Sequence, residues 1–210
     1  MQIVVISPEG EDPREIPAMS AMFASGLRRY HVRKPQWTAE RLEAWLRSLP
    51  VAWRRLLVLH QHQELVAQLR LGGSHTKDTP AGQVKLPQAS GPLSSRSTHD
   101  LATLKASLGK FHSVFFGPVF PSISKKGYGP APDFPAGDLR KLLAGRGLRR
   151  KSTSILALGG VTAENLALVR EMGFDGAAVH GAVWGVPNSS GAFARIWDAA
   201  AKKERRRRAA

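Results

Sequence analysis

The stretch SVFFGPVFPSISK, residues 113–125, begins as an apolar run and continues into a loop that carries two serines and a lysine. Residues 113–116 predict a buried strand, and the glycine and prolines that follow predict a turn. We therefore expect Ser122, Ser124 and Lys125 near the carboxyl end of that strand. Hydroxyl donors beside an ammonium group suit a phosphate or pyrophosphate, because they supply short hydrogen bonds and a compensating charge.

Short apolar runs of this kind alternate with helical patterns along the chain. Eight strands are expected, over residues 3–6, 30–33, 56–60, 73–75, 92–95, 113–116, 154–157 and 176–179. Helices are expected over residues 16–25, 38–47, 63–69, 98–107, 139–143, 163–172 and 192–203. This alternation is typical of a parallel sheet wrapped by helices, and eight such units predict a single-domain TIM (β/α)8 barrel of the α/β class.

The fourth unit is the least regular part of the pattern. Residues 77–92 contain Pro80, Pro87 and Pro92 and lack helical periodicity, so a shortened or irregular fourth β/α unit is expected. We assign residues 1–201 to the barrel domain and residues 202–210 to a basic C-terminal tail.

The chain carries a formal net charge of +15 at pH 7, and the tail adds six basic residues against one glutamate. A positive field attracts anionic ligands. No zinc-finger spacing or RNA-binding aromatic motif accompanies the charge, so we expect small phosphorylated molecules and not nucleic acid as partners. Two interpretations of the tail are open: it attracts a polyanion or a membrane surface, or it is a solvated chain end without a partner.

The chain contains no cysteine, which excludes a disulfide framework, a thiolate nucleophile and a Cys-ligated metal. No apolar run approaches the roughly 18 residues of a membrane span, and residues 1–6 do not resemble a signal peptide. We expect a cytoplasmic protein without a membrane partner.

Polar residues gather where several of the expected strands end. In a parallel barrel the ligand site lies at the carboxyl ends of the strands. Gly160, His180 and Gly181 follow the last two expected strands, where glycines can let backbone amides approach a phosphate. The same glycines equally permit tight packing between a strand and the following helix.

Three ordered motifs in this part of the chain resemble the thiamine phosphate synthase family and its relatives, the thiazole tautomerases. They are GPVFPSISK (117–125), ALGGVTAEN (157–165) and GAAVHGAV (176–183), and Ser-Thr-His at 97–99 is similar to the family's fifth-strand motif. The resemblance implies a transferase of thiamine biosynthesis that joins hydroxymethylpyrimidine pyrophosphate to thiazole phosphate. It also implies Mg²⁺ as a cofactor and favours a homo-oligomer.

The resemblance further implies roles for individual residues. Lys125, Arg33, His31 and His60 are the candidate catalytic residues. The candidate substrate-binding and phosphate-binding residues are Ser97, Ser122, Ser124, Gly160, His180 and Gly181. Ser122, Ser124 and Lys125 fit the loop that meets pyrophosphate, whereas the glycines and His180 lie where the family holds thiazole phosphate.

The first half of the chain departs from the family's motifs. The second-strand pattern Gln-x-Arg-x-Lys becomes His31-Val-Arg-Lys-Pro35, in which Lys34 stands one position before the family's lysine. The third-strand Asn-Asp pair, which serves Mg²⁺, aligns with His60 and Gln61. A second metal aspartate has no aligned partner, although Asp78 is nearby, so the metal ligands are not assigned. A thiazole tautomerase-like isomerase or a non-catalytic binder of phosphorylated ligands is therefore an alternative.

Histidines are expected at the same rim of the barrel, namely His31, His60, His75, His99 and His180. Imidazole groups can serve general acid/base catalysis near neutral pH. They can also hold a transition metal, for which His60, His62 and His75 are the candidates, or simply line a polar pocket through hydrogen bonds.

Overall fold

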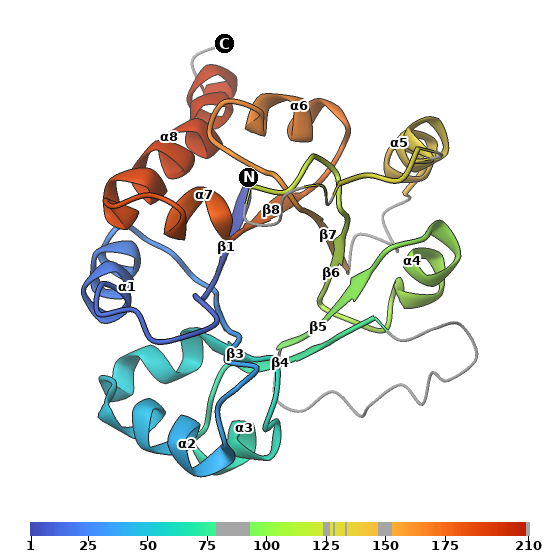
Figure 1. Ribbon diagram of the computed structural model, residues 1–210. Coiled ribbons are helices and arrows are strands. Elements are labelled where there is room, and N and C mark those ends of the chain that lie inside the picture. Colours follow the sequence, from blue (N-terminus) through green and yellow to red (C-terminus); the bar gives the residue numbers. More distant parts are fainter. Residues whose placement is uncertain (79–92, 124–126, 128, 133, 147–152, 209–210) are drawn as a thin grey trace.

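The chain forms a closed barrel of eight parallel strands in the computed structural model. The structure describes residues 1–78, 93–123, 127, 129–132, 134–146 and 153–208, with the backbone alone for 203–208. The strands follow one another in chain order and β1 pairs with β8 to close the sheet, with helices around its outside (Figure 1). They are β1 Gln2–Ile6, β2 Tyr30–Val32, β3 Leu57–Leu59, β4 Gly73–Thr76, β5 Leu93–Thr98, β6 Ser113–Phe116, β7 Ser154–Leu158 and β8 Gly176–Val179. The predicted TIM barrel is confirmed.

The helices cover the outer face of the barrel. They are α1 Glu15–Ala24, α2 Ala39–Ser48, α3 Glu64–Gln68, α4 Leu101–Ser107, α5 Ala136–Ala144, α6 Leu166–Glu171, α7 Gly181–Trp184 and α8 Ser189–Arg208, with a 3-10 helix at Val51–Leu56. The sequence prediction missed the 3-10 helix and α7, because one or two turns give too few residues for a periodic apolar pattern. None of the described helices is long and apolar enough to cross a membrane.

Helix α2 illustrates why the sequence forms these elements. Thr38 caps it, since the Thr38 side chain accepts a hydrogen bond from the backbone N–H of Arg41 at 3.3 Å. Leu42 and Leu46 lie on one face of the helix and are fully buried against the main core. Each buried leucine stabilises the fold by about 1.5–3 kcal/mol, so packing against the sheet outweighs the weak propensity of a short helix.

The interior of the barrel is divided into an apolar half and a polar half. The apolar half is a cluster of Val4, Ile6, Phe115, Leu156 and Ala178, which comes from β1, β6, β7 and β8. Strands β2, β4 and β5 and the residue after β3 instead contribute imidazole and hydroxyl groups, which are described below. The polar half therefore includes the second to fourth strands, where the sequence departs from the family motifs, together with β5, whose Ser97 agrees with them.

Two predictions about chain organisation concern the connection after β4 and the C-terminus. Residues 79–92 lie outside the described residues, so the prediction of an irregular fourth unit falls largely on them. Helix α8 continues to Arg208, which places the basic residues of the predicted tail on the last helix.

Candidate active site

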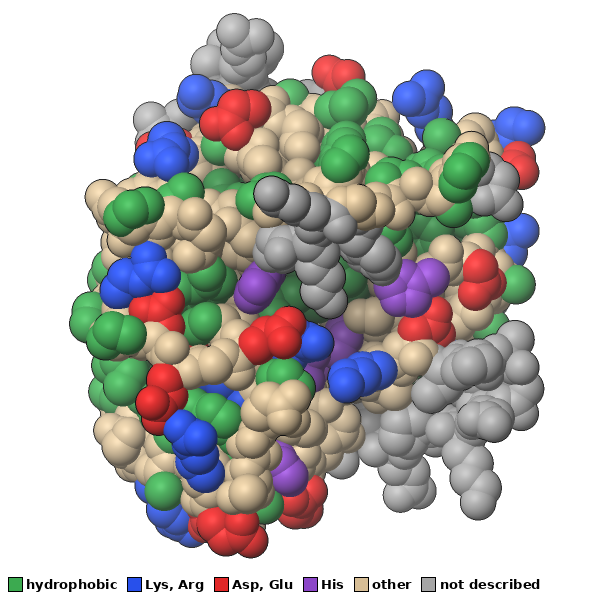
Figure 2. All heavy atoms as spheres, viewed as in Figure 1, with side chains coloured by type: hydrophobic (Ala, Val, Ile, Leu, Met, Phe, Trp, Pro, Cys, Tyr) green, Lys and Arg blue, Asp and Glu red, His purple; other side chains and the backbone are tan. Residues whose placement is uncertain are grey.

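A cavity of about 370 Å³ opens at the carboxyl ends of the strands. Histidine side chains are visible in the hollow on this face (Figure 2). Residues from the loops after β1 to β8 line the cavity, so all parts of the barrel rim contribute to it. This position is where parallel barrels bind their ligands.

Glycines form one side of the cavity. Gly159 and Gly160, after β7, have φ values of +91° and +63°, which L-residues with side chains rarely adopt. A Cβ atom on Gly160 would lie 2.3 Å from the Pro121 carbonyl oxygen, so this glycine lets the loop after β6 lie against the turn after β7. Gly160 also lines the cavity together with His180 and Gly181. The two interpretations of these glycines, tight packing and an approach to a ligand, are therefore compatible.

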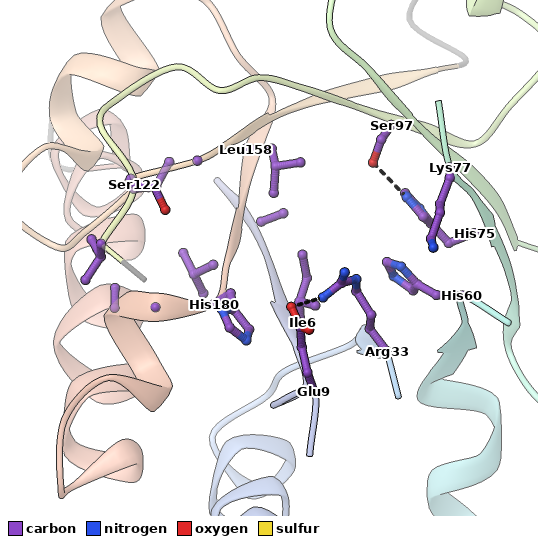
Figure 3. Close-up of a pocket in the computed structure, with 18 of the residues that line it drawn as sticks. Ile6, Glu9, Arg33, His60, His75, Lys77, Ser97, Ser122, Leu158 and His180 are labelled. Atoms are coloured by element: carbon purple, nitrogen blue, oxygen red, sulfur yellow. Dashed lines mark hydrogen bonds and ion pairs between the residues drawn. The ribbon is translucent and has the colours of Figure 1, made fainter. Parts of the chain in front are cut away.

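Cationic and hydroxyl side chains lie around the rest of the cavity. Figure 3 shows Lys77 and Ser97 on the side opposite His180 and Ser122, with Arg33 between them. The Arg33 guanidinium forms an ion pair with the Glu9 carboxylate. The cavity thus offers hydrogen-bond donors from two sides, as a ligand with two charged ends requires.

Three histidines meet in the polar half of the barrel: His31, His60 and His75. The Nδ1 atom of His31 lies 3.1 Å from Nε2 of His60, and the rings of His60 and His75 stack with centroids 4.1 Å apart. Burial lowers the pKa of His75 to about 3. Burial, with added repulsion from neighbouring histidines, also holds the pKa of His31 and of His60 well below the usual range. The rings are therefore uncharged near neutral pH.

These positions correct two expectations about the histidines. His60, His75, His99 and His180 line the cavity as predicted, whereas His31 lies deeper and lines a smaller cavity of about 270 Å³ at the opposite end of the barrel. His62 does not join His60 and His75, because its backbone turns to a φ of +53° and its Nε2 contacts the Trp37 carbonyl oxygen at 2.9 Å.

A family model described as thiamine monophosphate synthase matches residues 3–183. The chain belongs to this family. A curated thiamine-phosphate synthase from Methylobacillus flagellatus is 28% identical over 191 residues, which cover 87% of this chain and 87% of that relative.

Solved structures share the fold. A thiamine phosphate pyrophosphorylase from Bacteroides thetaiotaomicron has a TM-score of 0.74 and 24% identity and covers 97% of this chain and 98% of its own. A second one, from Pyrococcus furiosus, has a TM-score of 0.70 and 17% identity and covers 96% of each chain.

Lys34, which stands beside the position of the family's second-strand lysine, does not enter the cavity. Its Nζ atom lies 2.5 Å from the Glu15 carboxylate and 2.8 Å from the Gly10 carbonyl oxygen, and its side chain is fully buried. The ammonium group also lies 5.0 Å from the centre of the Trp37 ring. Lys34 therefore holds helix α1 to the barrel and does not replace the family's lysine.

The described carboxylates do not match the two-aspartate Mg²⁺ site of this family. Glu9 and Asp78 line the cavity, and each is paired with an arginine. Asp78 contacts Arg96 Nη2 at 3.2 Å and accepts a hydrogen bond from the His99 backbone N–H at 3.1 Å. At the third-strand pair the chain carries His60 and Gln61, so no carboxylate stands where the family has its metal aspartate.

Some residues of the cavity were not selected by the sequence prediction. Two residues that it did select lie outside the described part of the chain. Glu9 and Lys77 line the cavity without having been chosen, and Asp78, noted from the sequence only as a nearby aspartate, lines it as well. Lys77 and Asp78 directly follow β4, so their place at a strand end was the signal that could have identified them. Ser124 and Lys125 lie outside the described residues.

Proposed function

We propose that this chain is a thiamine phosphate synthase, which joins hydroxymethylpyrimidine pyrophosphate to thiazole phosphate and releases pyrophosphate. Membership of the family supports the reaction class. The observation that carries the proposal is the two-sided cavity, which Gly160 and Gly181 help to line, with His180 and Ser122 on one side and Ser97 and Lys77 on the other (Figure 3).

The reaction needs both phosphorylated ends held while the reacting rings meet between them. The carbon–oxygen bond to pyrophosphate breaks, and the same carbon forms its new bond to the thiazole. Fixing two substrates in this way contributes to the rate by removing the entropy cost of their encounter. The glycines and His180 would hold the thiazole phosphate, and Ser97, Ser122, Ser124 and Lys125 would bind the pyrophosphate.

The departing pyrophosphate gains negative charge in the transition state. Donors already oriented toward that charge lower the barrier, because they need no reorganisation as the bond breaks. In this proposal Arg33 and Lys125 supply the positive charge and the serines supply hydrogen bonds. Arg33 is held by Glu9, which fixes its direction and offsets part of its charge. We assign no step to Mg²⁺, because the described carboxylates do not form the family's site.

The test measures the rate at which the full chain forms thiamine phosphate from the two substrates. Lys125→Ala is the decisive variant, with Lys110→Ala as its control, since Lys110 is exposed and follows α4 at a distance from the cavity. Loss of one charge-assisted contact raises the KM for the pyrophosphate substrate about 10- to 100-fold. Full turnover by Lys125→Ala at subsaturating substrate would refute the assigned role.

A thiazole tautomerase-like isomerase is the second candidate, and the histidine-lined cavity favours it. Its reaction needs a proton donor and acceptor but no pyrophosphate site. Conversion between thiazole phosphate isomers without the pyrimidine substrate, together with absent thiamine phosphate formation, would support this candidate. Binding of both phosphorylated substrates without turnover would indicate a non-catalytic binder.

A further inference from the structure

Neighbouring strands each contribute one histidine to a single point inside the barrel. His31 belongs to β2, His60 directly follows β3, and His75 belongs to β4. One ring nitrogen from each lies within 4.8 Å of the others. The parallel pairing of β2 with β3 and of β3 with β4 therefore brings together residues far apart in the sequence.

The spacing of these nitrogens suits a tetrahedral metal ion. Zn²⁺ binds imidazole nitrogen at about 2.0–2.1 Å, which separates two ligand nitrogens of a tetrahedral site by about 3.3–3.4 Å. His31 Nδ1 and His60 Nε2 lie 3.1 Å apart and share a hydrogen bond, whose proton a bound ion would displace. The third nitrogen needs to move by at most about 1.5 Å, judged from the 4.8 Å limit.

Hydroxyl groups orient the third imidazole. His75 Nδ1 lies 2.8 Å from the Ser95 hydroxyl, and that hydroxyl donates its own hydrogen to the Ser74 carbonyl oxygen at 3.3 Å. With Ser95 donating to Ser74, Nδ1 of His75 donates to Ser95 and Nε2 accepts from the Ser97 hydroxyl at 2.9 Å, a hydrogen bond that an ion on Nε2 would replace. Fixing the tautomer of a histidine through its other nitrogen is what outer-shell partners do in metal sites.

We propose that His31, His60 and His75 form a binding site for a divalent transition-metal ion such as Zn²⁺ or Co²⁺. An all-nitrogen set selects such ions over Mg²⁺, which requires oxygen ligands. His60 and His75 also line the cavity, so the ion has an open position that faces it. Three protein ligands and one open position are the arrangement of catalytic rather than structural zinc sites.

The test uses the full chain, stripped with a chelator and dialysed, and titrated with Co²⁺ and Zn²⁺ separately. We expect about one ion per chain and a visible Co²⁺ spectrum of the tetrahedral type. His60→Gln and His75→Gln each weaken binding by more than about a hundredfold, since loss of an outer-shell partner alone costs about 10- to 100-fold. His62→Gln is the matched control, because this neighbour points to the Trp37 carbonyl, and it keeps the affinity unchanged.

Two further measurements make the outcome decisive. Mg²⁺ in about a thousandfold excess leaves Co²⁺ bound if the ligands are nitrogen. X-ray absorption of the Zn²⁺-loaded, unsubstituted chain counts the ligands even where a variant fails to fold, and three imidazole nitrogens are expected. Predominantly oxygen ligation, displacement by Mg²⁺, equal weakening in His62→Gln, or no stoichiometric binding would overturn the proposal. None of these measurements depends on turnover, so they test the metal site independently of the proposed synthase activity.

Discussion

Replacing Lys34 by methionine should destabilise the fold and leave the active site intact. Lys34 Nζ lies 2.5 Å from Glu15 Oε2, and the Tyr30 hydroxyl donates to the other Glu15 oxygen at 2.8 Å. Methionine removes the ammonium group, so the Glu15 carboxylate would remain buried without its counter-charge. Breaking a buried pair by removing one partner costs about 3–5 kcal/mol in the free energy of unfolding.

For a chain of this length that cost corresponds to a melting temperature lower by about 6–20 °C, at about 2–4 °C per kcal/mol. Urea and thermal unfolding followed by tryptophan fluorescence measure it, and Trp37 beside Lys34 makes the signal sensitive to the change. Adding Glu15→Gln to Lys34→Met should recover much of the loss, because no buried charge then lacks a partner. Burial already raises the pKa of Glu15, so the loss should also shrink at acidic pH as the carboxyl becomes protonated.

Arg47→Met is the matched control. Arg47 pairs with Glu43 across one turn of α2, on the surface, where such pairs contribute about 0–1 kcal/mol. A loss below about 1 kcal/mol in Lys34→Met would refute the stabilising role. Reduced synthase turnover by fully folded Lys34→Met, without a change in stability, would show that Lys34 acts in the site.

Other predictions follow from the same structure. Gly160→Ala places a Cβ atom 2.3 Å from the Pro121 carbonyl oxygen at a φ of +63°, so we expect a loss of about 1–3 kcal/mol in urea unfolding and a higher KM for thiazole phosphate in steady-state kinetics. Burial raises the pKa of Tyr30 well above 10, so above that pH the unfolded chain loses a proton that the folded chain keeps, and stability falls. Urea unfolding between about pH 9 and 11 should show this fall, and Tyr30→Phe should flatten it. Ser97→Ala should raise the KM for the pyrophosphate substrate about tenfold, with Ser48→Ala, on the surface end of α2, unchanged; an equal effect in both variants would contradict a role for Ser97 in the site.

The strands could be predicted more accurately than the site, because strand patterns are local. The predicted ranges 113–116 and 176–179 agree with β6 and β8, and both strands are apolar runs bounded by turn residues. The grouping of histidines depends instead on how distant strands pair. The sequence favoured His62, only two positions after His60, but extended geometry does not continue past His60. His31 takes its place because β2 lies beside β3.

The alternation of side chains along β2 and the residues after it explains the chemistry of this site. Tyr30, Val32 and Lys34 face outward, where Tyr30 and Lys34 both contact Glu15 of α1. His31 and Arg33 face inward, toward the other histidines and Glu9. Successive residues of an extended chain point to opposite sides. A lysine at position 34 therefore points away from the side that a lysine at position 35 would face, and cannot replace it.

Lys34 therefore brings no ammonium group to the cavity, and His31 places an imidazole deeper inside the barrel. Lys77, which follows β4 and lines the same cavity, supplies an ammonium group from a strand end two strands away from β2. Arg33 and Lys77 keep positive charge at the cavity, while the inner positions on β2, after β3 and on β4 carry histidines. The two changes are linked by geometry, since His31 and Arg33 are two residues apart in one extended segment and both point into the barrel.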